Sequence, residues 1–327
     1  MKIGSKQKCP CGSGKKYKHC HRGFSFKQVI MKSPFQFEKK LFDSDTAETK
    51  AVLEWCFAAT LGPLDFGLKT YSASMHSLQG QRLNPDDSRG LILGFHAKAI
   101  DQVIAIGALV DSGSIGPAVG QLRTLFEMYL YQAYILESDT ETRITNYKLS
   151  FLRDNATWAK RMVAYGDNSA KMHAFASTVL DKSQSLPRNR SWTGKTIEQL
   201  ATDLGIGKLY LAIYRTACAA THSMDILSCY NPIFHQVWNQ AIHNEPLFIS
   251  NFGVFSASDA AGLVFYMHFL PYALFANTTS FLNISLDQNE DAFVKACRAV
   301  LSDQNLSVTS SMDEIMQAHR ELSSNFS

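Results

Sequence analysis

The residues best suited to chemistry lie near the N-terminus, in the stretch CPCGSGKKYKHCH that begins at Cys9. One residue separates Cys9 from Cys11, and Cys20 and His21 follow further on as an adjacent pair. The glycines between the two pairs allow the backbone to turn sharply. Three thiolates and one imidazole form a closed tetrahedral set, which is the usual coordination of a structural zinc. The stretch therefore predicts a structural zinc site, with His19 and His21 as alternatives for the imidazole.

The same stretch resembles the SEC-C motif, the zinc-binding tail of the preprotein translocase motor SecA, which is also attached to many unrelated bacterial proteins. The usual form of the motif, C-P-C-G-S-G-K-K-Y/F-K-x-C-C/H, agrees with residues 9–21 almost letter for letter. The resemblance implies one structural Zn²⁺ per chain, because a catalytic zinc keeps a coordination position open for water. It also implies His21 as the fourth ligand, so that the predicted set is Cys9, Cys11, Cys20 and His21.

Basic residues beside an aromatic ring lie inside this motif, at Lys15, Lys16, Tyr17 and Lys18. Residues 1–23 carry seven Lys and Arg and no acidic residue, which leaves 25 basic and 29 acidic residues in the remainder. Such a patch favours RNA, whose phosphates attract the cations and whose bases can stack on the ring. The SEC-C resemblance implies docking to a ribosome or an acidic protein surface. A merely solubilising lysine face is the third alternative.

A second candidate pair, Arg123 and Glu127, occurs in QLRTLFEMYLYQAYI. A spacing of four places both side chains on one face of a helix, among apolar neighbours. A partly buried arginine needs a carboxylate partner, which predicts an internal ion pair. The alternative is an arginine available to a phosphate group.

A third candidate pair, Arg215 and His222, occurs in YRTACAATHSMD. Seven residues are about two helical turns, so both side chains would point the same way. A histidine can move a proton near neutral pH, and an arginine can stabilise a charged phosphorane. Together they would suffice for metal-independent RNA cleavage by the 2′-hydroxyl, with Arg123 and Glu127 in support. The alternative is a histidine hydrogen-bonded in the core.

An arginine followed at short range by a histidine, late in an all-helical domain, resembles the HEPN superfamily. That resemblance implies an endoribonuclease of the toxin–antitoxin or phage-defence type, acting as a homodimer. The body also resembles an uncharacterised bacterial helical family, which pairs an R-x3-E helix (Arg123 and Glu127) with a later histidine (His222). The second family implies no activity.

The elements that would position these residues are helices throughout. Long apolar blocks have helical periodicity, and none has convincing period-two alternation. The sequence predicts an all-α multi-helix bundle, divided into a zinc knuckle at 1–23, a linker at 24–49 and an all-helical domain at 50–327. The expected helices are 50–61 (ended by Gly62 and Pro63), 89–110, 117–137, 139–165, 169–182, 196–204, 208–229, 233–243, 256–284, 289–302 and 312–324.

Composition indicates a cytoplasmic protein that makes no membrane contact. The N-terminal charges lead into cysteines rather than into the apolar stretch of a secretory signal. The isolated cysteines Cys56, Cys218, Cys229 and Cys297 are typical of reduced core thiols. The longest apolar run, Ala260 to Ala276, is shorter than a spanning helix and predicts a buried one.

Two functions follow from these patterns. A binding or adaptor protein would dock through the basic SEC-C motif on RNA, a ribosome or a protein, while the helical domain recognises a further ligand. The alternative is a HEPN-like endoribonuclease that uses Arg215 and His222. A glycine-rich phosphate loop, G-x-S-x-G and H-E-x-x-H are all absent from the sequence, which gives no support to NAD, ATP or common hydrolase chemistry.

Overall fold

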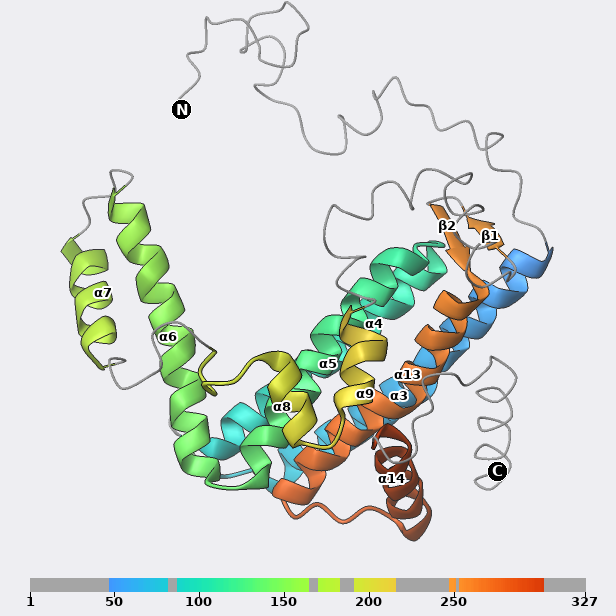
Figure 1. The fold of residues 1–327 in the computed structure, drawn as a ribbon. Coiled ribbons are helices and arrows are strands. Elements are labelled where there is room, and N and C mark those ends of the chain that lie inside the picture. The colour runs from blue at the N-terminus through green and yellow to red at the C-terminus, as the bar shows by residue number, and fades with distance from the viewer. Residues whose placement is uncertain are drawn as a thin grey trace, which may run out of the picture. The chain divides into compact units, whose positions relative to one another are not determined.

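A computed structural model describes residues 47–81, 87–164, 170–182, 191–215, 247–250 and 253–302 (Figure 1). The chain divides into two units, Met1–Asp43 and Ser44–Ser327, and every described residue belongs to the second. The domain boundaries predicted after residues 23 and 49 stay a prediction.

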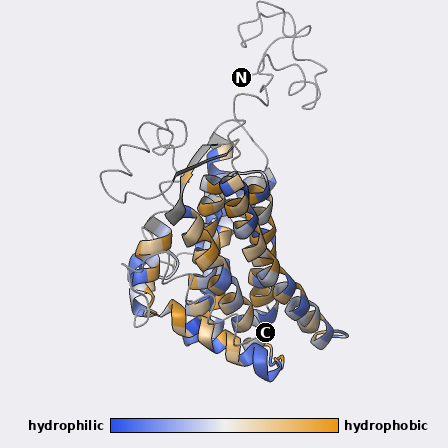
Figure 2. Ribbon diagram, turned by 90° about the vertical axis from the view of Figure 1, so that its right-hand side faces the viewer, coloured by the Kyte–Doolittle hydropathy of each residue, from blue (hydrophilic) through white to orange (hydrophobic). Residues whose placement is uncertain are grey.

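Four long helices form the main bundle, and they confirm the predicted all-α class. They are α3 (Ala47–Ser77), α4 (Ser88–Asp111), α5 (Ile115–Glu137) and α13 (Ala257–Phe281). Helix α13 packs against the other three, and α4 packs against both α3 and α5. Figure 2 shows hydrophobic residues along the length of these helices.

Further helices surround this bundle in the described part of the second unit. Helices α6 (Thr140–Ala164) and α7 (Ala170–Lys182) form a pair. Helix α8 (Ile197–Asp203) and the π-helix η1 (Tyr210–Arg215) pack on α5, and the short helix α9 (Gly207–Leu209) contacts both of them. Helix α14 (Gln288–Leu301) packs on α13. The helices predicted near 89–110, 117–137, 139–165, 169–182, 196–204, 256–284 and 289–302 are thus confirmed within a few residues. The predictions at 233–243 and 312–324, and most of 208–229, lie outside the described residues.

The predicted stop at Gly62 and Pro63 is wrong, because α3 continues through both residues to Ser77. A proline inside a helix sacrifices a backbone hydrogen bond and ordinarily kinks or ends it. Here Pro63 is buried and Gly62 lies against α13, where an added Cβ would come within 2.6 Å of the Tyr272 hydroxyl. We infer that packing of the surrounding helices outweighs the local cost.

A short antiparallel hairpin precedes α13, and the sequence analysis missed it. Strand β1 (Leu247–Ser250) pairs with β2 (Gly253–Ser256), with Phe248 opposite Phe255 and Ile249 opposite Val254. Each strand has only four residues, which is too short for alternation to stand out from a buried apolar run.

The core of the bundle is built from large apolar side chains supplied by all four long helices. Phe126, Ile106, Leu130 and Phe275 are fully buried in it, and Cys56 and Cys297 are buried free thiols. Burial raises the pKa of both thiols to about 12, so they remain protonated and unreactive at neutral pH. The core-thiol prediction is confirmed for these two, and Cys218 and Cys229 lie outside the described residues.

The α6–α7 pair has a separate small core made of Ala156, Ala159, Ala176 and Val179. The largest apolar side chains of α6 instead face solvent, with Phe151 65% and Trp158 56% exposed. Alanines let the two helices approach closely but bury little apolar surface.

Three helices are long and apolar enough to cross a membrane by length and composition alone, namely Ala47–Ser77, Ser88–Asp111 and Asp259–Phe281. The apolar windows of these helices are 33%, 56% and 67% buried inside the protein, respectively. The run Ala260 to Ala276 is therefore largely a buried helix, as predicted. The absence of membrane contact stays a prediction.

Candidate functional site

The pair Arg123 and Glu127 lies on α5 and forms the predicted ion pair. Arg123 Nε donates to Glu127 Oε1 at 3.1 Å, and the two side chains are 24% and 29% exposed. Both groups are thus half-buried at the side of the bundle, where water screens their attraction only in part.

Tyr214 completes this cluster from the π-helix η1. Its hydroxyl accepts a hydrogen bond from Arg123 Nη2 at 2.9 Å, and its ring centroid is 4.6 Å from Arg123 Cζ. The guanidinium therefore contacts both the hydroxyl and the ring of one tyrosine. Tyr210 stacks on Tyr214 at 5.2 Å, and Phe126 of α5 packs against it at 6.3 Å.

Sequence analysis did not identify Tyr214, which is 91 residues from Arg123 along the chain. The one available signal was YLAIYR, in which two tyrosines four residues apart precede a candidate arginine. π-Helical turns are rare and are often found at functional sites. The placement of η1 beside α5 thus makes Tyr214 a further member of the candidate site, which comprises Arg123, Glu127 and Tyr214.

The Arg215 and His222 pair cannot be assembled from the described residues. Arg215 is the last residue of η1, directly after Tyr214, so its backbone lies in the segment that packs on α5. His222 lies outside the described residues. The structure therefore brings the element that carries Arg215 to the helix that carries Arg123, and leaves the predicted pairing with His222 untested.

The residues predicted to bind zinc and to contact a partner, within 9–21, also lie outside the described residues. Among the described residues, no three His, Cys, Asp or Glu side chains lie close enough together to hold a metal ion. The fit of zinc to the N-terminal motif therefore rests on the chemistry of its donors. Three thiols and an imidazole are soft and borderline donors that suit Zn²⁺.

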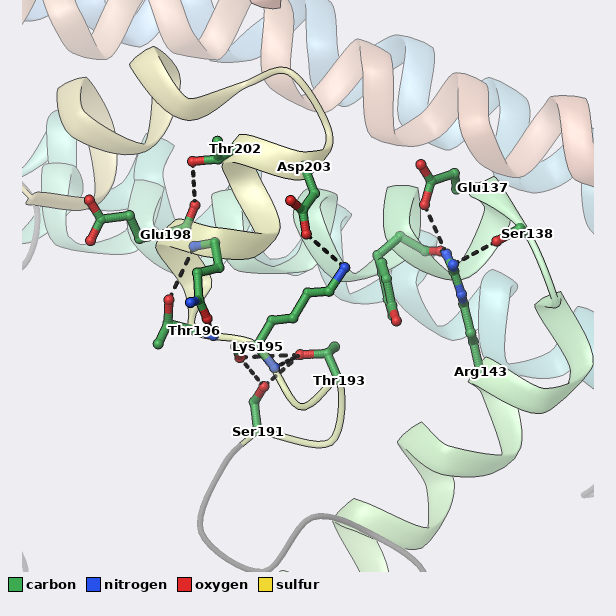
Figure 3. Close-up of polar contacts among 12 residues, drawn as sticks. Glu137, Ser138, Arg143, Ser191, Thr193, Lys195, Thr196, Glu198, Thr202 and Asp203 are labelled. Atoms are coloured by element: carbon green, nitrogen blue, oxygen red, sulfur yellow. Dashed lines mark hydrogen bonds and ion pairs between the residues drawn. The ribbon is translucent and has the colours of Figure 1, made fainter.

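A second polar region lies where the segment before α8 meets α5 and α6, with the Lys195 ammonium over the ring of Tyr134 (Figure 3). Lys195 pairs with Asp203 at 2.7 Å, and Arg143 pairs with Glu137 at 3.1 Å. The Thr196 side chain accepts from the Gln199 backbone N–H, and the Gln199 side chain accepts in return, which caps α8. These bonds are local, and they fasten a connecting segment.

Aromatic rings lie directly beside this polar region. Trp192 is 7% exposed and packs against Tyr131, Tyr134 and Tyr147, at centroid distances of 5.3 to 5.6 Å. Burial raises the pKa of Tyr131 and Tyr147, so both phenols stay neutral. We interpret this region as structural rather than as a ligand site, because both of its cations, Arg143 and Lys195, already contact the ring of Tyr134.

His96 of α4 is fully buried against α3 and α13. Its Nε2 is 2.9 Å from the Gly67 carbonyl oxygen, and its ring stacks on Phe275 at 4.4 Å. Burial lowers the pKa of His96 to about 4, so the ring is neutral at pH 7 and donates from Nε2.

The fold and the N-terminal donors together define a class: an all-helical protein that carries a zinc-binding type of motif ahead of its body. Two protein-family models match the chain. One, the SEC-C motif, matches residues 6–23. The other, described as a family of unknown function (DUF5677), matches residues 89–231. No solved structure matches the chain.

The first match confirms the SEC-C resemblance. The second spans the candidate site, since Arg123, Glu127, Tyr214, Arg215 and His222 all fall within 89–231. Its description assigns no activity, and neither match is to a HEPN family. The HEPN-like resemblance therefore stays a prediction.

Proposed function

We propose that the protein is a cytoplasmic binding or adaptor protein that docks through a zinc knuckle and recognises a further ligand with its helical body. The SEC-C match at residues 6–23 carries this proposal, because the match includes every predicted zinc ligand and all the clustered lysines. One Zn²⁺ per chain would be held by Cys9, Cys11, Cys20 and His21. The metal supplies folding free energy to the knuckle and leaves no open position for catalysis.

Charge supports docking on a polyanion. Lys15, Lys16 and Lys18 surround Tyr17, and residues 1–23 contain no acidic side chain. RNA, alone or in a ribosome, would meet these cations with phosphates and could stack a base on the tyrosine. An acidic protein surface would meet the same cations without using the ring.

The site on the body supports binding more than catalysis. Arg123 is already paired with Glu127 and contacts the ring and hydroxyl of Tyr214. An arginine held in this way fixes η1 to α5 and leaves about a quarter of each charged side chain exposed for a ligand to contact. The body would therefore present a fixed polar surface.

Zinc content and partner capture test the proposal in the full chain. We expect about one zinc per chain by inductively coupled plasma mass spectrometry, and loss of that zinc in Cys20→Ser. In the triple variant Lys15→Glu, Lys16→Glu and Lys18→Glu, zinc should stay bound while affinity for a mixed RNA pool and for ribosomes falls at least about tenfold.

A matched control makes the same change of charge ahead of the first predicted zinc ligand, at Lys2, Lys6 and Lys8. An equal loss of affinity in the control would assign binding to net charge alone and would contradict a defined docking surface. Replacement of Tyr17 by Ala separates the partners, because stacking on RNA needs the ring. Protein with no stoichiometric zinc would refute the knuckle itself.

The alternative function is a HEPN-like metal-independent endoribonuclease. The packing of η1 on α5 favours it in one respect, since Arg215 follows directly after the tyrosine that contacts Arg123. We would expect RNA cleavage that resists chelators and is abolished by His222→Ala and by Arg215→Ala. RNA left intact by wild-type protein, or cleaved equally by His222→Ala, would refute this alternative.

A further inference from the structure

The outer face of α3 carries a row of apolar side chains in a heptad spacing. They occur at intervals of four, three, four, three and four residues, and we call them the α3 seam: Phe57, Leu61, Leu64, Leu68, Tyr71 and Met75. Alternation of three and four residues is the spacing by which one helix packs along another. The row extends over 18 residue steps, or about 27 Å of helix.

Much of the seam is open to solvent. Phe57 is 37%, Leu61 51%, Leu68 51% and Met75 45% exposed. Isolated exposed apolar residues are ordinary, but a continuous row of large ones marks a contact surface. Leu64 and Tyr71 are partly buried and join this row to the core.

The seam is distinct from the face by which α3 joins its own bundle. Inside the bundle, Thr60 faces Gly107 of α4, Gly67 faces Ile100 of α4, and Phe66 packs on Phe275 of α13. All three α3 residues are buried. The long helix thus has two apolar faces, and only one of them is covered by the described residues.

A neighbouring helix widens the seam. The Phe57 ring reaches Gly107 of α4, at 3.8 Å from a Cβ built there. Ile104 lies one turn before Gly107 and is 51% exposed. The exposed apolar surface therefore includes parts of α3 and α4.

Lipid suits this face less well than another helix does. Asp65 and Lys69 lie midway along α3, and Lys69 forms an ion pair with Glu290 of α14. Charged groups at the middle of a membrane segment cost several kcal/mol. A protein partner, by contrast, would allow these side chains to stay hydrated at the edge of the contact.

We propose that a second copy of this chain covers the α3 seam, with α3 packed against α3 of the partner about a two-fold axis. A heptad row fits best against a helix that has the same spacing, and a second copy has it by identity. The exposed side chains of this surface are Phe57, Leu61, Leu68, Met75 and Ile104. Their burial in both copies would remove about 850 Å² of apolar surface, and a polar rim would bring the contact area above the ~1,000 Å² typical of biological interfaces.

The test is the oligomeric state of the full chain. Sedimentation equilibrium and light scattering should give twice the chain mass of 36.5 kDa for the wild type. The double variant Leu61→Glu and Leu68→Glu would place four carboxylates in the contact and should raise the dimer dissociation constant at least about 100-fold. Phe151→Glu is the matched control, because Phe151 is 65% exposed on α6, and this variant should stay dimeric.

The helical circular dichroism of the double variant should equal that of the wild type, since both leucines are half-exposed. If it does not, Leu61→Ser with Leu68→Ser provides a milder variant for the same measurement. A monomeric wild type, or a dimer that survives both seam variants, would overturn the proposal. Binding of wild-type monomer to phosphatidylcholine–phosphatidylglycerol vesicles, lost in the seam variants, would also overturn it in favour of lipid. None of these outcomes depends on zinc or on the lysines of the motif.

Discussion

The main bundle and the α6–α7 pair are both helices packed on helices, yet they bury different kinds of side chain. The bundle buries large residues such as Phe126, Phe275 and Leu130, whereas the α6–α7 pair buries three alanines and Val179. On α6, the side chains of Phe151 and Trp158 face solvent. Because stabilisation grows with the apolar area removed from water, the two regions should differ in local stability.

The largest expected effect is in the bundle, at Phe275. This ring is fully buried against His96 and lies next to Gly67. Phe275→Ala should leave a cavity and lower the free energy of unfolding by about 4 kcal/mol. Urea unfolding monitored by circular dichroism would measure the change. A loss below ~1 kcal/mol would show that the core collapses around the gap.

The next largest effect is a dependence of bundle stability on pH. Burial lowers the pKa of His96 to about 4, against about 6.5 in the unfolded chain. The unfolded chain therefore binds the proton first as pH falls. The stability contributed by the neutral ring is complete above pH ~6.5 and is lost toward pH 4, by up to about 3 kcal/mol.

His96→Gln provides the comparison, because glutamine does not titrate. Unfolding free energies at pH 7 and pH 4.5 should differ less in this variant than in the wild type. An identical pH dependence in the two proteins would contradict the assignment to His96. Any release of zinc from the N-terminal motif at low pH should affect the wild type and His96→Gln equally. It therefore cancels when the pH dependence of one protein is subtracted from that of the other.

A smaller and local effect is expected in the α6–α7 pair. Val179→Ala removes the largest side chain of its core and should lower local stability by about 1–2 kcal/mol. Hydrogen exchange should quicken in α7 and in the part of α6 that packs on it, with α3 and α13 unchanged. Equal acceleration in α13 would show that the two cores unfold as one.

The smallest effect is expected on the exposed face of α6. Trp158 is 56% exposed, so Trp158→Ser should change the free energy of unfolding by no more than about 0.5 kcal/mol. Thermal unfolding compared with the wild type would measure it. A loss near 2 kcal/mol would mean that Trp158 is covered in solution, and the contrast between the two regions would then be smaller than the structure indicates.

Local patterns predicted the fold well wherever they extended over many residues. Helix α4 follows the apolar block predicted at 89–110, and the structure shows Asp87 capping it by accepting from the Arg89 backbone N–H. The prediction that Pro63 ends the helix was wrong, because the contacts that hold α3 together there come from α13, about 200 residues away in the chain. Secondary structure set by distant packing leaves little trace in a local pattern.

For the candidate site, too, the contacts within one helix could be predicted from sequence and the contacts between distant segments could not. Arg123 and Glu127 could be paired from sequence, since four residues of one helix fix their proximity. Tyr214 could not, because the packing of η1 on α5 joins residues that are far apart in the chain. The SEC-C motif, which the family match at residues 6–23 confirms, could be recognised from short spacing without any tertiary context, and its four zinc ligands stay a prediction.

The π-helical turn at Tyr210–Arg215 makes the length of that segment matter. A π-turn holds one residue more than an α-turn, so an α-helical path would need one residue fewer over the same rise. Deletion of a single residue there would rotate each later side chain by about 100° around the axis. The number of residues in this turn, as well as their chemistry, thus sets which side chain contacts Arg123. It also sets the direction in which the backbone leaves the turn after Arg215.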